Sequence, residues 1–218
     1  MDFKLGHYQE SCGLCRLTSR CYDIRLCRPM FGMKSTATGS FPAARTIMLP
    51  ASSFAMLRRG QGLAFIFLKS AGAGNNLAFL VGEGFRCSGY DANRTAIEYA
   101  RHRIGAAADL RVACFPEVPF PDTQFDLIVE RAALCYADFP TALETVSTLR
   151  RKLKPGGKFL FTPYTEHADA PGVMWWCDRD IVEQLFAGWT VLSLTSAIYR
   201  DEIAGKILWG ELRVIVQS

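Results

Sequence analysis

The residues best suited to chemistry lie between Leu63 and Asp91, in the stretch LAFIFLKSAGAGNNLAFLVGEGFRCSGYD. An unbroken apolar run is followed by a turn of small residues, a helix-like stretch, a second strand-like run and an acid. Glycines in such a turn let a ligand approach the backbone, and an acid after the second strand can accept hydrogen bonds from both ribose hydroxyls. A glycine-rich turn alone is equally well explained as a tight strand-to-helix connection. The acid in the required place makes the pattern favour a nucleotide-type ligand.

The elements that must position these residues alternate between strand-like and helix-like from residue 63 onward. Helices are expected over 75–82, after a cap at Asn93, after Pro140 and from Asp178 to Leu185. Strands are expected at 63–68, 85–90, 110–115, 125–130, 158–162, 189–198 and 207–216. Repeated strand–helix units predict a parallel sheet, to which the terminal pair adds an antiparallel edge.

Three stretches in this order resemble motifs of the class I S-adenosylmethionine-dependent methyltransferases. AGAGNNLAFLVGEGFRCSGYDANRTAIEYAR resembles the first motif and second strand, PFPDTQFDLIVERAALCYAD the fourth motif, and LRRKLKPGGKFLF the fifth. The resemblance runs from about Ala71 to the C-terminus. It implies an α/β, Rossmann-like three-layer sandwich with a mostly parallel seven-stranded sheet and an antiparallel last strand. It also implies S-adenosylmethionine as cofactor.

The resemblance assigns a cofactor role to four segments. The turn from Ser70 to Gly74 would pass under the methionine part, Asp91 would hold the ribose, and Ala92 would lie beside the adenine. The residues concerned are Ser70, Ala71, Gly72, Ala73, Gly74, Asp91, Ala92, Cys114, Phe115, Glu130, Arg131 and Ala132. Of these, Cys114 and Phe115 would flank the adenine, and Glu130 to Ala132 would lie beneath the sulfonium. Core packing explains Cys114 and Phe115 equally well.

Methyl transfer mainly requires that a nucleophile be held in line with the methyl group, and a base helps only where a proton must leave. The candidates on the acceptor side are Tyr136, Tyr164 and His167, the last two in the segment after the fifth strand. A half-buried core tyrosine and a solvated loop histidine are the alternatives for Tyr136 and His167.

Three departures from the family pattern favour a rival interpretation. Leu68 stands where the first strand normally ends in an acid, Ser70 replaces the first glycine, and Cys114 replaces another acid. Each lost polar contact costs on the order of 1–3 kcal/mol. The chain could therefore be a methyltransferase-like protein that binds cofactor weakly and has no catalytic activity.

Residues 1–62 form an atypical, cysteine-containing segment whose apolar residues follow neither the period of a helix nor that of a strand, so it is expected to be irregular. Residues 63–218 form the methyltransferase-like domain. Residues 1–70 carry ten basic and three acidic side chains, a balance of +7; the whole chain has +4, so the rest has −3. This basic segment leaves open an RNA-associated methyltransferase. Because the resemblance starts abruptly near Ala71, a further hypothesis is that the residues before about 70 are translated from a shifted reading frame or come from a recombined gene start.

Four cysteines, Cys12, Cys15, Cys21 and Cys27, lie near the start of the chain. They could hold zinc, but structural zinc sites use two close pairs and only one is present, so no metal is expected. The remaining cysteines are expected to be reduced and buried.

The length of 218 residues, with 50% hydrophobic and 21% charged residues, fits one α/β domain. No apolar run approaches the roughly 20 residues of a membrane helix, and the first ten residues do not resemble a secretory signal. We therefore expect a cytoplasmic protein. The function that the family resemblance favours is methyl transfer from S-adenosylmethionine to oxygen or nitrogen of a small molecule, with no membrane partner expected and nucleic acid less favoured as the acceptor.

Overall fold

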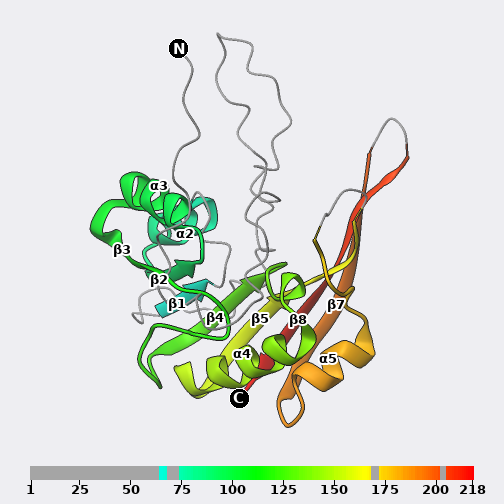
Figure 1. The fold of residues 1–218 in the computed structure, drawn as a ribbon. Helices are drawn as coiled ribbons and strands as arrows, with labels where there is room; N and C mark the ends of the chain where they lie inside the picture. Colours follow the sequence, from blue (N-terminus) through cyan, green and yellow to red (C-terminus); the bar gives the residue numbers. More distant parts are fainter. Residues whose placement is uncertain (1–63, 68–73, 168–171, 202–204) are drawn as a thin grey trace. The chain divides into compact units, whose positions relative to one another are not determined.

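The computed structural model describes residues 64–67, 74–167, 172–201 and 205–218, and for 64–67 and His167 the backbone only (Figure 1). The expectations for residues 1–62, including the four cysteines there, lie outside the described residues. Five strands run parallel in the order β3-β2-β1-β4-β5. Their bounds are Ala64–Phe67 for β1, Arg86–Asp91 for β2, Ala108–Val112 for β3, Phe125–Arg131 for β4 and Leu153–Thr162 for β5. The predicted α/β fold with a parallel sheet is thus confirmed.

The other side of the sheet is antiparallel and contains one strand segment more than predicted. β8 (Ile207–Gln217) pairs antiparallel with β5, with β6 (Tyr164–His167) and with β7 (Thr190–Arg200). The expected pairing of the last two strands is confirmed. The described sheet has eight strands rather than seven because β5 and β6 are separated by Pro163, which has no N–H to donate to β8. Its carbonyl oxygen still accepts the Leu212 N–H at 3.1 Å.

The third and fifth strands differ from the prediction. β3 covers 108–112 instead of 110–115, since it pairs with β2 only from Cys87 to Asp91 and the following residues pass beyond the end of β2. β5 begins at Leu153 rather than Lys158. Its pairing with β4 is irregular between Phe125 and Leu127, so the Pro-Gly-Gly segment lies within an irregular part of the strand.

The helices begin where the sequence places capping side chains. Asn93 accepts a hydrogen bond from the Ala96 N–H at 3.2 Å, Asp138 from Thr141 at 2.8 Å and Asp178 from Ile181 at 2.9 Å, which satisfies N–H groups that have no partner within the helix. The α-helices are α2 (Asn75–Gly82), α3 (Arg94–Ile104), α4 (Phe139–Lys152) and α5 (Arg179–Leu185), and the short helices are η3 (Gly105–Ala107) and η4 (Leu134–Tyr136).

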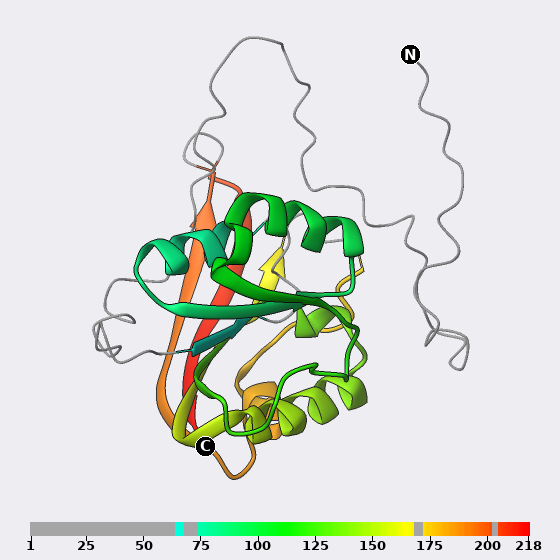
Figure 2. The ribbon, with the colours of Figure 1, turned by 90° about the vertical axis from the view of Figure 1, so that its left-hand side faces the viewer.

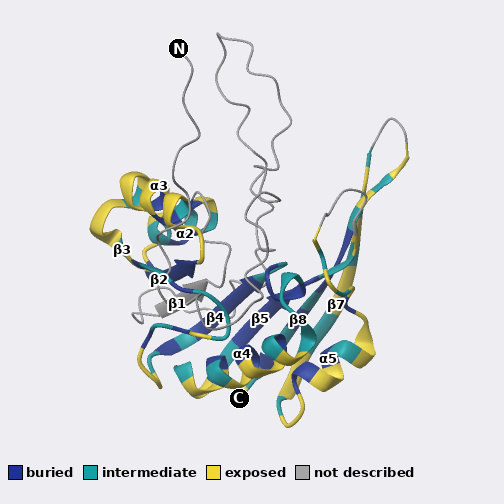
Figure 3. Cartoon of the chain, in the orientation of Figure 1, coloured by how far each residue is buried: buried dark blue, intermediate teal, exposed yellow. Residues whose placement is uncertain are grey.

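Two apolar clusters fill the two faces of the sheet. Successive residues of a strand point to opposite faces, so Leu127 and Val129 pack under α2 and α3 while Ile128 packs under α4 and α5. Figure 2 shows the two helix pairs on opposite sides of the sheet. The central strands are the most buried elements (Figure 3). This three-layer packing holds the carboxyl ends of the parallel strands in fixed register.

Gly74 precedes α2 and has a left-handed backbone, with φ of 74°. A Cβ atom there would lie 2.8 Å from Ile104 Cδ1 and 3.2 Å from Ala100 Cβ, so the glycine lets the start of α2 approach α3. We expect Gly74→Ala to lower the free energy of unfolding by about 1–3 kcal/mol, from the left-handed conformation and the overpacking. Urea unfolding measures the change.

Gly82→Ala is the matched control because Gly82 ends the same helix and a Cβ there meets no atom within 4 Å. It should leave stability unchanged or raise it by up to about 1 kcal/mol. Equal losses for the two variants would contradict the packing role of Gly74.

No helix among the described residues is both long and apolar enough to span a lipid bilayer.

Candidate functional site

The carboxyl ends of the parallel strands bring two acidic side chains to one edge of the sheet. Asp91 is the last residue of β2, and Glu130 is the last but one of β4. β1 lies between them, and its last residue pairs with both Gly89 and Val129. Tyr90 and Glu130 thus lie at one level two strands apart, a backbone separation of roughly 10 Å at about 4.8 Å per strand. In open α/β sheets, ligands bind at this edge.

Asp91 is 7% exposed, and its Oδ1 atom accepts the backbone N–H of Asn93 at 2.8 Å. The cap of α3 is Asn93 and not Asp91, as the sequence suggested. The carboxylate of Asp91 therefore remains at the end of its strand, at the start of the turn into α3.

Glu130 is fully buried, with 0% exposure. Its Oε1 atom accepts the backbone N–H groups of Ala133 at 2.5 Å and Leu134 at 2.8 Å, whereas Oε2 has no hydrogen-bond partner among the described residues. Burial raises the pKa of this carboxyl to about 7, against the opposing effects of the two N–H groups and the Arg131 charge. Such a group exchanges a proton near neutral pH.

Tyr90 lies on the same face of the sheet as Glu130 and next to Asp91. Its ring packs edge-to-face on the Phe115 ring, with ring centroids 6.2 Å apart. Its hydroxyl is buried with no hydrogen-bond partner among the described residues. Burial raises the pKa of Tyr90, and the charges of Glu130 and Asp91 raise it further. A buried polar atom without a partner costs about 1–3 kcal/mol, so two of them at one strand edge fit a site that binds a polar ligand.

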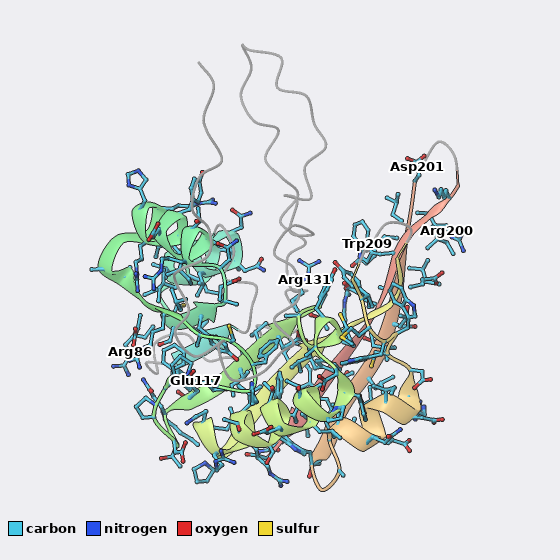
Figure 4. The ribbon with its side chains drawn as sticks, in the orientation of Figure 1. Arg86, Glu117, Arg131, Arg200, Asp201 and Trp209 are labelled. Carbon is cyan, nitrogen blue, oxygen red and sulfur yellow. The ribbon has the colours of Figure 1, made fainter. Side chains whose placement is uncertain are left out.

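A second charged cluster lies along the same edge, at the ends of β4 and in β8. Glu211 is 3% exposed; its Oε1 accepts hydrogen bonds from Arg213 Nε at 2.8 Å and from the Tyr199 hydroxyl at 3.1 Å. Its Oε2 lies 3.9 Å from an Arg131 nitrogen. The Tyr199 ring stacks on Trp209 with centroids 4.5 Å apart. Figure 4 shows Arg131 at the ends of the central strands and Trp209 farther along toward the β7–β8 hairpin.

The remaining residues assigned to the cofactor fall into three groups. Ala92 is exposed in the turn after Asp91, and Cys114 and Phe115 are half-buried in the loop after β3. Ala132 has a left-handed backbone (φ 47°), and its N–H donates to the Thr162 carbonyl at 3.0 Å. The segment from Ser70 to Ala73 lies outside the described residues.

The three candidates on the acceptor side are not equally placed. Tyr164 and His167 belong to β6 rather than to a loop, and only the backbone of His167 is described. Burial raises the pKa of Tyr164, while Arg131 lowers it and Glu211 and Glu130 raise it, so Tyr164 lies among these charges. Tyr136 is half-buried in η4.

The sequence interpretation missed Tyr90, Glu211 and Arg213. A signal existed for Glu211, because an acid inside the strand-like run ILWGELRVIV is seldom buried unless it is paired. The sequence did not indicate a functional role for Tyr90, because tyrosine is common in β-strands. Of the four scattered cysteines, Cys87, Cys135 and Cys177 are buried as expected, whereas Cys114 is half-buried. The described residues contain no group of three or more His, Cys, Asp or Glu that could hold a metal ion.

Comparisons with known proteins agree with the resemblance. Residues 70–161 match the family described as a methyltransferase domain. No curated protein matches the chain in sequence.

Solved structures share the fold at low sequence identity. A SAM-dependent methyltransferase from Methanosarcina mazei is 17% identical with a TM-score of 0.64, over 78% of this chain and 98% of that one. A TehB-like SAM-dependent methyltransferase from Corynebacterium glutamicum is 19% identical with a TM-score of 0.56, over 74% and 82%. The [4+2]-cyclase SpnF is 16% identical with a TM-score of 0.59, over 72% and 75%.

The family match covers the first, fourth and fifth motifs, and the five parallel strands have the order that this fold requires. S-adenosylmethionine is the cofactor that this family implies. Residues 70–161 therefore resemble a methyltransferase domain, in a chain whose fold is that of S-adenosylmethionine-dependent methyltransferases.

Proposed function

We propose that the domain transfers the methyl group of S-adenosylmethionine to an oxygen or nitrogen atom of a small-molecule acceptor. The observation that carries the proposal is the pair of buried acids, Asp91 and Glu130, at the carboxyl ends of β2 and β4. One acid suits a ribose diol and the other a positively charged sulfur, and the two strand ends are separated by a single strand.

The chain's own residues would bind and orient the cofactor. Asp91 would accept hydrogen bonds from the ribose, Ala92 with Cys114 and Phe115 would contact the adenine, and the segment from Ser70 to Gly74 would pass under the methionine part. Glu130, Arg131 and Ala132 would lie beneath the sulfonium. The bound cofactor would supply a methyl group already activated for displacement, so the protein mainly has to align the acceptor.

The acceptor would lie beside β6 and η4. Tyr164 lies among the charges of Arg131, Glu211 and Glu130, which favours it over Tyr136 as a residue that contacts the acceptor. His167 is also a candidate for contacting the acceptor, because its backbone belongs to β6, the strand that contains Tyr164.

Two alternatives keep specific support. Leu68, Ser70 and Cys114 replace residues that bind the cofactor in the family pattern, which favours a binding protein without methyl transfer. The [4+2]-cyclase with this fold illustrates that the architecture also carries other activities. The basic residues 1–70 favour an RNA acceptor.

Calorimetric titration of the whole chain with S-adenosylmethionine and S-adenosylhomocysteine tests the proposal. We expect both ligands to bind at one site per chain. Absence of heat and of any shift in melting temperature with either ligand would reject the cofactor site. Binding without methyl transfer to small amines, phenols, carboxylates or RNA would support the non-catalytic alternative.

A further inference from the structure

The carboxyl of Glu130 is held rigidly at the end of β4. Two N–H groups bind its Oε1 atom, and its backbone carbonyl accepts the Thr162 hydroxyl at 2.9 Å. The left-handed Ala132 turns the chain back so that the N–H groups of Ala133 and Leu134 reach the carboxyl. The side chain cannot rotate into water without breaking these bonds, so Oε2 stays in the interior.

The described groups around Glu130 provide little positive charge. Its charge raises the pKa of Tyr90 in β2, of Tyr164 in β6 and of Cys177 in the segment before α5, so these groups lie within electrostatic range of it. Arg131 is the only cation among the described residues that acts on Glu130, and it also lies 3.9 Å from Glu211. Among the described residues an ionised Glu130 thus has one nearby cation, so a positively charged ligand would stabilise its ionised form.

We propose that Glu130 neutralises the positive charge of the bound cofactor and then accepts the proton that the acceptor loses. This inference rests on the proposed function. In the step, the bond between methyl and sulfur breaks with its electron pair left on sulfur, and the acceptor atom forms the new bond to the methyl carbon. The acceptor's proton moves to Glu130 Oε2. A carboxylate facing a cation becomes a neutral acid facing a neutral sulfur, so the buried site has the same net charge before and after transfer.

This arrangement explains why a buried acid is placed where a neutral side chain would cost less. With no ligand, a carboxyl with a pKa of about 7 is half protonated at neutral pH. A neighbouring cation favours the ionised form, so S-adenosylmethionine would expel the proton that S-adenosylhomocysteine would leave in place.

The test counts protons by titration calorimetry at pH 7 in phosphate and in Tris, buffers with different ionisation enthalpies. The two ligands share an amino-acid end, whose amine also exchanges protons, so the informative quantity is the difference between ligands compared across variants. The excess proton release is the number of protons released on binding S-adenosylmethionine minus the number released on binding S-adenosylhomocysteine. We expect this excess to be about half a proton larger for the wild type than for Glu130→Gln. At pH 8, the ratio of the affinity for S-adenosylmethionine to the affinity for S-adenosylhomocysteine should be about tenfold lower for Glu130→Gln than for the wild type.

Gln preserves the bonds to Ala133 and Leu134 because its carbonyl can replace Oε1. Glu144→Gln is the control, since Glu144 is exposed on α4, and it should behave as wild type. If the difference in proton release between the two ligands is the same for Glu130→Gln as for the wild type, the proposal is overturned. If neither ligand binds the wild type, the cofactor site itself is rejected and this inference with it.

A second measurement keeps the test independent of the variant's folding. In the wild type alone, the difference in proton release between the ligands should shrink toward its pH 9 value as the pH rises from 6.5, because Glu130 is then ionised in every state. A difference that does not change between pH 6.5 and 9 would overturn the proposal.

Discussion

Replacing Glu130 by Gln should make the ligand-free protein more stable at pH 8, by roughly 3 kcal/mol. The reason is the cost of ionising a buried carboxyl: its pKa rises from an ordinary 4.5 to about 7, and each unit corresponds to about 1.4 kcal/mol. Between these pH values the folded protein binds more protons than the unfolded chain, so stability falls as the pH rises. The contribution of the protonated form is complete below pH 4.5 and lost by the time the pH has passed 7.

Urea unfolding of both proteins from pH 4.5 to 8.5 measures this effect. The two proteins should be similar near pH 4.5 and diverge as the pH rises, with the variant the more stable. Glu144→Gln, on the exposed face of α4, should follow the wild type throughout. If Glu130→Gln is instead less stable at pH 8, the ionised carboxylate has a stabilising partner in the folded protein, and the buried acid is structural.

Replacing Asp91 by Asn should weaken the binding of S-adenosylhomocysteine by roughly ten- to a hundredfold. Asn keeps the size of the side chain but loses its charge and one acceptor, and charge-assisted hydrogen bonds are worth about 1.5–3 kcal/mol each. Asp91 is 7% exposed, and its carboxylate accepts a hydrogen bond from the Asn93 N–H. The amide oxygen can keep that bond, so unfolding should change by less than about 1 kcal/mol.

Calorimetric titration gives the affinity, and Asp109→Asn is the matched control. Asp109 lies near the start of β3, far along the strand from the carboxyl edge, and its ion pair with Arg111 is about half exposed, so binding should not change. If Asp91→Asn binds like the wild type but unfolds several degrees earlier, Asp91 only closes the turn into α3.

The sequence by itself determined the elements whose cause is local. Apolar runs, helix periodicity and capping side chains predicted the parallel strands and the starts of α3, α4 and α5, because each of these signals acts within a few residues. The acid at Asp91 was also identified from its position after the second strand. The ends of the strands were predicted less accurately than their positions. β3 ends at Val112 because Val112 pairs with Asp91, the last residue of β2, and this pairing joins separate segments of the chain.

The tertiary structure alone decided the electrostatics of the site. Nothing local to FDLIVER indicates that Glu130 is fully buried, that both Ala133 and Leu134 bind one of its oxygens, or that the buried Tyr90 lies two strands away. Likewise, the pairing of β8 with β6 and β7 is needed to place Glu211 beside Arg131, Arg213 and Tyr199. Burial and the charges of distant residues set a pKa, and both depend on contacts between segments that are far apart in the chain.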